Sequence, residues 1–266
     1  MQKELKAKYN KLKNYLSTLD EIVIAYSGGV DSTLLLKVAR DIELLRVYAI
    51  IGKTSSTPAD EFTSALTTAR QIGIEPVVLE TEEMNSPEFC SNSLDRCYHC
   101  KKSIFKTFQN YIDSLGMKNL ADGSNYDDLS DFRPGTRALE EYGVISPFKE
   151  NGFTKNDIRE LSKELMLPTW NKEAMACLAT RIAYGEPINT KKLEMIEEAE
   201  NYLRKMGFTS VRARIQGQQL RIESSADQLY KFFEEDVRQQ VIQKMKEIGF
   251  KFITIDMEGY RMGSMN

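Results

Sequence analysis

Histidine is almost absent from this 266-residue sequence, which contains only His99. A relay of histidine side chains is therefore excluded as a general mechanism of proton transfer. Long apolar runs are also missing. Stretches such as 22–26 are strand-sized and fall far short of the roughly 20 apolar residues that a membrane-spanning helix needs. The first residues are charged and precede no apolar run, so we predict no signal peptide and expect a cytoplasmic protein.

An excess of positive charge is lacking as well. Acidic residues number 39 and basic residues 36, and the isoelectric point lies near 5.5. This balance disfavours broad affinity for a nucleic-acid backbone. Prolines number only 7, and a hydrophobic content of 41% with 28% charged residues is typical of a folded chain. A chain of this length is expected to form a large domain with a smaller partner.

Candidate strands and helices alternate through the first part of the chain, which predicts a parallel sheet with helices on both faces. The expected strands are 22–26, 46–51, 76–79 and 119–121, and the expected helices are 2–18, 32–40, 57–72, 94–115 and 154–165. Thr57 is expected to cap the third of these helices, with Pro58 as its first residue, and Thr154 is expected to cap the last, with Asp157 three residues on. We assign this α/β domain to residues 1–185.

The sequence pattern changes over the remaining residues, 186–266, and predicts a small α+β domain for substrate binding or oligomerisation. Its expected helices are 189–206, 226–233 and 237–248, and its expected strands are 211–215, 220–223 and 251–256.

The segment Ser27-Gly28-Gly29-Val30-Asp31-Ser32 lies between the first strand and an apolar helix. Consecutive glycines allow a pyrophosphate to approach the backbone, and the helix start offers unpaired N–H groups and a partial positive charge. The sequence has neither a Walker A loop nor a dinucleotide-binding fingerprint. The alternative is an ordinary glycine turn.

This segment resembles the PP-loop of ATP pyrophosphatases. The resemblance implies that Ser27, Gly28, Gly29, Asp31 and Ser32 contact ATP, with Asp31 near Mg²⁺. Carboxylate oxygen suits that ion. The metal and the loop amides would stabilise charge on the departing pyrophosphate. The later turn 122–125 can also hold ATP or magnesium, although turns of its composition are common.

Four cysteines make up a second feature. Cys97 and Cys100 are three residues apart near the start of the expected helix 94–115, so both sulfurs should share one helix face. Cys177 lies between the two domains as we assign them. Three thiolates suit a [4Fe-4S] cluster with one open iron, whereas zinc prefers a fourth ligand. Zinc, free thiols and a persulfide on Cys177 stay open. Cys90 is expected to be a buried small residue.

Further segments resemble the LarE family of sulfur insertases over nearly the whole chain. They are Trp170-Asn171-Lys172, 177–181, Tyr184-Gly185, 211–214 and Gly259-Tyr260-Arg261-Met262-Gly263. The resemblance implies adenylation of a carboxylate of pyridinium-3,5-dicarboxylic acid mononucleotide and replacement of AMP by sulfur. It also implies ATP, Mg²⁺ and, in the three-cysteine version, a [4Fe-4S] cluster on Cys97, Cys100 and Cys177. A sulfide donor and a homo-oligomer are expected.

Arg212 and Arg214 alternate along an expected strand and so point to one side, where they can clamp a phosphate. A solvated strand face is the alternative. With the LarE resemblance, Thr180, Arg181, Arg212 and Arg214 become candidate anchors of the substrate phosphate. Two other functions stay open: a tRNA-thiolating or other AMP-forming enzyme of the PP-loop class, and a nucleotide-binding module with structural zinc.

Overall fold

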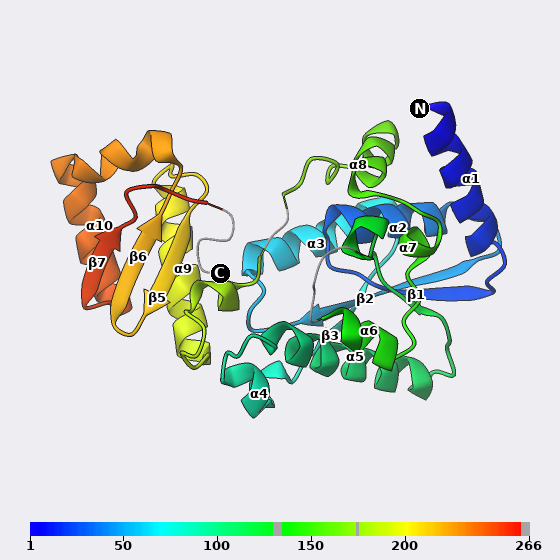
Figure 1. The fold of residues 1–266 in the computed structure, drawn as a ribbon, viewed down its shortest axis with the longest axis horizontal. Coiled ribbons are helices and arrows are strands. Elements are labelled where there is room, and N and C mark those ends of the chain that lie inside the picture. Colours follow the sequence, from blue (N-terminus) through cyan, green and yellow to red (C-terminus); the bar gives the residue numbers. More distant parts are fainter. Residues whose placement is uncertain (130–134, 174–175, 262–266) are drawn as a thin grey trace. The chain divides into compact units, whose positions relative to one another are not determined.

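The computed structural model describes residues 1–129, 135–173 and 176–261, which belong to two compact units (Figure 1). Unit 1 comprises residues 1–86 and 97–175, and unit 2 comprises residues 87–96 and 176–266. The division differs from the predicted boundary at 185/186. Residues 87–96 leave the first domain and join the second through backbone hydrogen bonds to residues 185 and 188. Met262 and Gly263, which carry part of the resemblance, lie outside the described residues.

Unit 1 is built on a parallel sheet with the strand order β3-β2-β1-β4. Its strands are β1 (Glu21–Ala25), β2 (Arg46–Lys53), β3 (Val77–Glu80) and β4 (Leu120–Ala121). Strand β1 lies between β2 and β4, so the chain passes from β1 to β2 on one side and later places β4 on the other side. The carboxyl ends of β1 and β4 therefore mark the point at which the strand order reverses, where α/β sheets bind their ligands.

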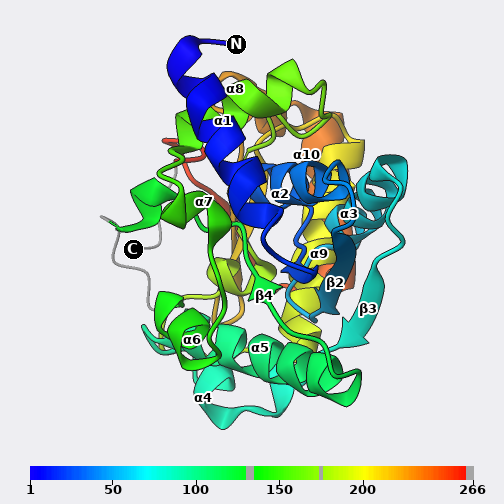
Figure 2. The same ribbon diagram turned by 90° about the vertical axis from the view of Figure 1, so that its right-hand side faces the viewer.

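Helices cover both faces of this sheet, as the α/β prediction required (Figure 2). One face carries α1 (Lys3–Leu16), α2 (Val30–Arg40), α3 (Ala59–Ile72), α7 (Pro147–Glu150) and α8 (Lys155–Glu164). The other face carries α5 (Arg96–Ser114) and α6 (Thr136–Glu141). The side chains of β1 alternate accordingly: Ile22 and Ile24 pack into the first core and Val23 into the second. Short 3₁₀ turns at η1 (Glu83–Asn85) and η2 (Tyr126–Leu129) complete the described elements of the unit.

Two helix starts in unit 1 test the capping predictions. The Thr154 hydroxyl accepts from the Asp157 N–H and Asp157 accepts from the Thr154 N–H, so the predicted start of α8 is confirmed. The predicted cap of α3 is wrong, because its N-cap is Pro58. The hydroxyl of Thr57 lies 2.7 Å from that of Thr54, and this local contact takes the place of a cap.

Unit 2 contains a mixed three-stranded sheet in the order β5-β6-β7. Strands β5 (Arg212–Gln216) and β6 (Gln219–Glu223) are antiparallel, and β6 and β7 (Phe252–Ile255) are parallel. The helices are α4 (Pro87–Cys90), α9 (Thr190–Lys205) and α10 (Glu235–Ile248), with 3₁₀ segments η3 (Leu178–Arg181) and η4 (Ala226–Phe233). Helix α9 packs on β5 and α10 packs on α9. The segment 226–233, which was expected to be a helix, forms the 3₁₀ helix η4.

Over the three described ranges, every helix is too short or too polar to cross a bilayer.

Candidate functional site

The loop between β1 and α2 brings together the five residues predicted to contact nucleotide. The Ser27 N–H donates to Ser32 Oγ at 3.2 Å, and the two serine hydroxyl oxygens lie 3.1 Å apart, so the loop is closed on itself. Gly29 is the N-cap of α2. Because glycine has no side chain to accept the first N–H groups of the helix, these groups are left for an anionic ligand.

Two glycines are required by close packing around this loop. Gly28 has a φ of +72°, and a Cβ placed on it would lie 2.4 Å from the Cβ of Ala65 in α3. A Cβ on Gly123 would lie 2.9 Å from the backbone nitrogen of Ser32. The loop after β1 therefore packs against α3 on one side and against the turn 122–125, which follows β4, on the other. No larger residue fits either position without a shift of backbone.

A cavity of about 630 Å³ lies at the carboxyl ends of these strands, within unit 1. We call it the nucleotide cavity. Its polar lining comes from the two loops and includes Ser27, Asp31, Ser32, Asp122, Ser124 and Asn125. Its apolar lining includes Ile51, Phe62, Ile104, Phe105 and Phe108. A polar end beside an apolar wall suits a ligand with both a phosphate chain and a flat ring. Phe105 and Phe108 of α5 thus belong to the second core and also line this cavity.

Lysines from distant parts of the chain reach the loop, and the sequence patterns did not reveal this. Lys155 Nζ lies 2.5 Å from Asp31 Oδ2, and Asn125 Nδ2 donates to Asp31 Oδ1 at 3.4 Å. Lys172 Nζ donates to the Gly28 carbonyl at 3.1 Å and pairs with Glu61 at 2.7 Å. The only available signal was Lys172 in the segment that resembles LarE. Lys155 directly follows Thr154, the N-cap of α8, so its place in the sequence indicates only a residue in the first turn of that helix.

The cysteines fall into two units. Cys97 and Cys100 lie in the first turn of α5, as predicted; Cys97 is exposed and Cys100 half-buried. Cys177 is the N-cap of η3 in unit 2 and is half-buried. Cys90, expected to be buried, is half-buried. Taken singly, neither unit gathers three His, Cys, Asp or Glu side chains into a metal-binding group among the described residues. The meeting of all three thiols stays a prediction, because it needs both units.

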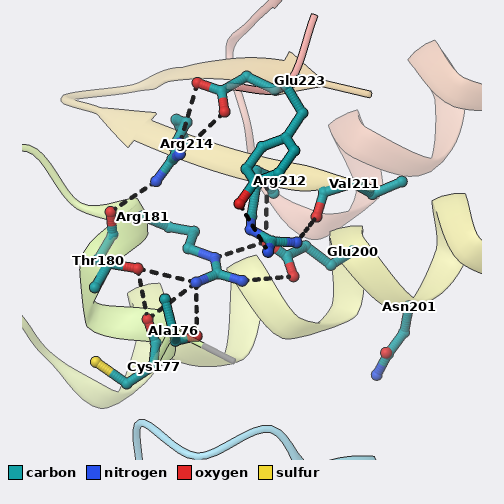
Figure 3. Close-up of polar contacts among 12 residues, drawn as sticks. Ala176, Cys177, Thr180, Arg181, Glu200, Asn201, Val211, Arg212, Arg214 and Glu223 are labelled. Carbon is teal, nitrogen blue, oxygen red and sulfur yellow. Dashed lines mark hydrogen bonds and ion pairs between the residues drawn. The ribbon is translucent and has the colours of Figure 1, made fainter. Parts of the chain in front are cut away.

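The turn that contains Cys177 is held by a buried arginine (Figure 3). Arg181 is fully buried and pairs with Glu200, equally buried, at 2.9 Å. Its Nη1 donates to the carbonyls of Ala176 and Cys177 at 2.7 and 3.1 Å and to the Thr180 hydroxyl at 2.9 Å. The sulfur of Cys177 points away from the guanidinium group (Figure 3). Arg181 thus fixes the backbone from which this sulfur projects.

The two strand arginines have different partners. Arg214 makes a two-pronged ion pair with the fully buried Glu223 and donates to the Thr180 carbonyl at 2.9 Å. Arg212 stacks on the ring of Tyr260 and donates to the Val211 carbonyl at 2.8 Å. Burial lowers the pKa of Arg212, and the charge of the nearby Arg181 lowers that pKa further. Whether these groups and Thr180 anchor a substrate stays a prediction.

The parallel sheet, its glycine loop and the cavity at the strand ends define an α/β protein of the PP-loop ATP pyrophosphatase class. The chain is 23% identical over 207 residues to a GMP synthase (glutamine-hydrolyzing) of Aeropyrum pernix, which covers 68% of this chain and 39% of that one. No protein-family model matches the chain.

Several relatives match almost from end to end. An uncharacterized protein of Synechocystis sp. is 38% identical over 262 residues, 98% of each chain. The pyridinium-3,5-bisthiocarboxylic acid mononucleotide synthase of Lactiplantibacillus plantarum is 32% identical over 255 residues, 94% of this chain and 91% of that one. The chain therefore belongs to the LarE family, whose enzymes use the PP-loop fold.

Proposed function

We propose that this enzyme adenylates a carboxylate of pyridinium-3,5-dicarboxylic acid mononucleotide and converts the carboxylate to a thiocarboxylate. A substrate carboxylate oxygen attacks the α-phosphorus of ATP, and pyrophosphate leaves. A sulfur nucleophile then attacks the carbonyl carbon of the acyl-adenylate, and AMP leaves with its bonding electron pair. Neither step needs a strong protein base, because the carboxylate is ionised at neutral pH and AMP is a good leaving group. A single histidine is consistent with this chemistry.

One observation carries the proposal. Helix α5 carries Cys97 and Cys100 near its start at Arg96, and three of the residues that follow, Lys101, Ile104 and Phe105, line the nucleotide cavity. The same helix therefore contributes to the ATP site and presents two thiols at its start. A binding module with no sulfur chemistry has no need for this combination.

The loop residues support the first step. The amides at the start of α2 would bind the β and γ phosphates, and the hydroxyls of Ser27 and Ser32 would add donors. Asp31 supplies a carboxylate oxygen for Mg²⁺, which would stabilise the charge that develops on pyrophosphate. Asp31 bonds to Lys155 and Asn125 in the structure. We propose that Lys155 turns to the phosphates when the nucleotide arrives.

The thiols support the second step. Cys97, Cys100 and Cys177 would hold a [4Fe-4S] cluster, which when bound supplies the sulfur. Two observations fit this donor set: the three-residue spacing of Cys97 and Cys100 on α5, and the position of Cys177 on a turn fixed by Arg181. This chain would then act repeatedly, because its own cysteine sulfur is not consumed.

The arginines of unit 2 support recognition of the substrate phosphate. The hydrogen-bond and stacking partners described for Arg212 are Tyr260 and the Val211 carbonyl, and the charge of Glu200 acts on it as well. Burial lowers the pKa of Arg212, and a phosphate would give its guanidinium group a two-pronged, charge-assisted contact. We propose Arg212 and Thr180 as direct anchors. Arg181 and Arg214, which pair with Glu200 and Glu223, would support these anchors from behind. A homo-oligomer stays part of the proposal.

Product analysis tests this function. The anaerobically purified protein is supplied with ATP, Mg²⁺, sulfide and the pyridinium dicarboxylate, and mass spectrometry should find the thiocarboxylate together with AMP and pyrophosphate. Iron and sulfide should be bound in the wild type and lost in Cys97→Ala. Bound zinc without iron would overturn the cluster. Pyrophosphate release driven by tRNA instead of the dicarboxylate would overturn the substrate.

A further inference from the structure

The segment 87–96 leaves unit 1 and packs within unit 2, and Cys97 is the residue that follows it. This segment holds a buried asparagine, Asn92, with a side chain that is fully enclosed. Its backbone lies in the left-handed region at a φ of 55°, which asparagine tolerates better than most residues. An enclosed polar side chain in such a conformation is retained only where its hydrogen bonds are satisfied.

Asn92 has both ends of its amide occupied. Its Nδ2 donates to the carbonyls of Ile182, Ala183 and Glu186 at 3.3, 2.8 and 3.0 Å. Its Oδ1 accepts from Arg96 Nη1 at 2.6 Å, and its own carbonyl accepts from the Gly185 N–H at 3.0 Å. One side chain thus joins the segment 87–96 to the segment 182–186.

These two segments lead directly to the proposed cluster ligands. Ile182 is the C-cap of η3, the turn that begins at Cys177. Arg96 precedes Cys97, is nearly buried, and stacks on the ring of Tyr184 at 4.4 Å. Arg96 and the Cys177 turn therefore belong to the same compact unit, although Cys97 belongs to the other.

We propose that Asn92 is a positioning residue that links Cys97 to the Cys177 turn through Arg96 and Ile182. The inference rests on the proposed function, in which these thiols bind one cluster. The position of Arg96 relative to the Cys177 turn is then set within unit 2, and Cys97 is joined to Arg96 by the next peptide bond.

Cross-linking of the cluster-free full chain tests this link without any sulfur transfer. In a background of Cys90→Ser and Cys100→Ser, a short bismaleimide should join Cys97 to Cys177, and peptide mass spectrometry measures the yield. Asn92→Gly keeps the left-handed backbone accessible and removes only the side chain. We expect the yield to fall about tenfold, because the effective concentration of one thiol near the other drops. Asn92→Asp, which replaces the donor by an acceptor facing three carbonyls, should lower it as well.

Asn119→Gly is the matched control. Asn119 also has a positive φ, 58°, and its Nδ2 donates to a backbone carbonyl, that of Glu21 in unit 1, at 3.1 Å. This variant should keep the wild-type yield. Circular dichroism at the reaction temperature verifies that each variant is folded.

Iron content gives a second readout. After anaerobic reconstitution, the Asn92→Gly chain with all four cysteines should bind less iron than Asn119→Gly. Equal cross-linking in Asn92→Gly and the wild type, or no link between Cys97 and Cys177 in either, would overturn the inference. If the link depends on Asn92 but the wild type makes no thiocarboxylate, the positioning role stands and the proposed function falls.

Discussion

The ion pair beside the nucleotide cavity of unit 1 and the ion pair behind the Cys177 turn of unit 2 differ in their exposure to water. At the nucleotide cavity, the side chains of Lys155 and Asp31 are 36% and 23% exposed. In unit 2, Arg181 and Glu200 are fully enclosed. A half-exposed pair in contact with water can exchange its partner for a ligand at small cost. An enclosed pair cannot, because its separation leaves an unpaired charge away from water.

This difference separates two roles that sequence motifs do not distinguish. Asp31 and Lys155 are available to a metal ion and a phosphate. Arg181 pairs with Glu200 and donates to the carbonyls around Cys177, so its main effect is on the geometry of that turn. Charged residues near a site can therefore act on the ligand or on the fold, and their burial indicates which of the two roles they have.

Removal of one partner of the enclosed pair is expected to give the largest effect. Glu200→Ala leaves the Arg181 guanidinium buried without its carboxylate, and it also removes the acceptor for the Ala213 N–H at 3.1 Å. We expect the free energy of unfolding to fall by about 3–5 kcal/mol. Denaturant unfolding, monitored by circular dichroism, measures this change.

Glu198→Ala is the control on the same helix. Glu198 pairs with Lys244 at 2.6 Å, but its side chain is half-exposed. The loss should stay below about 1 kcal/mol. Equal losses for Glu198→Ala and Glu200→Ala would remove the distinction between the two kinds of ion pair.

A second comparison uses two neighbouring glycines of the PP-loop. Gly28→Ala forces a side chain into the left-handed region and towards Ala65, so we expect a loss of about 2–5 kcal/mol in stability. Gly29→Ala adds a Cβ 3.5 Å from Ser27 Oγ, an ordinary contact, and its φ is −77°. This variant should fold normally and bind ATP more weakly. Thermal unfolding and ATP titration separate the two outcomes, and normal stability of Gly28→Ala would show that the loop is looser than described.

The half-exposed pair is expected to show a smaller effect, in binding instead of folding. Lys155→Met removes a charge-assisted contact to the phosphates, so the affinity for ATP should fall about tenfold. Stability should change little, because water replaces the lost partner of Asp31. Lys37→Met is the control: Lys37 forms a 2.7 Å pair with Asp41 on the same helix as Asp31. An unchanged ATP affinity in Lys155→Met would mean that Lys155 only pairs with Asp31.

Local sequence patterns predicted most of this architecture. The strands of unit 1 and helix α8 were placed to within about two residues, because apolar periodicity and the Thr154–Asp157 cap act over short distances. The fold class is confirmed by the parallel sheet. The loop residues Ser27 to Ser32 were found for the same reason, since a strand, two glycines and a helix are contiguous.

Contacts between distant segments were not predicted. Lys155 reaches Asp31 from 124 residues away, and Asn92 reaches Ile182 from 90 residues away. The assignment of 87–96 to unit 2 depends on such contacts, as does the pairing of Arg181 with Glu200. Periodicity carries no information about them. These long-range contacts depend on the tertiary packing of the helices and strands.

A half-buried pair, Lys8 with Asp157, lies between the two extremes and gives the smallest expected effect. Their side chains are 25% and 17% exposed and 2.8 Å apart. Burial raises the pKa of Asp157, but hydrogen bonds from Lys8 and Thr154 outweigh it and hold this pKa below the usual 3.8. The carboxylate therefore adds stability above its unfolded-state pKa, and this contribution disappears as the pH falls through the lower folded-state pKa.

Asp157→Asn should reduce the free energy of unfolding by about 1 kcal/mol at pH 7, the typical loss when a helix cap is weakened. The difference from the wild type should shrink as the pH is lowered from 7 towards 2, because Asp157 becomes neutral as the pH falls through its lowered folded-state pKa. Urea unfolding across this pH range measures both values. Glu4→Gln, which removes the exposed second carboxylate beside Lys8, should change stability by less than about 0.5 kcal/mol. A loss in Asp157→Asn that is the same at pH 2 and pH 7 would show that the shape of the cap matters and its charge does not, because only the charge depends on pH.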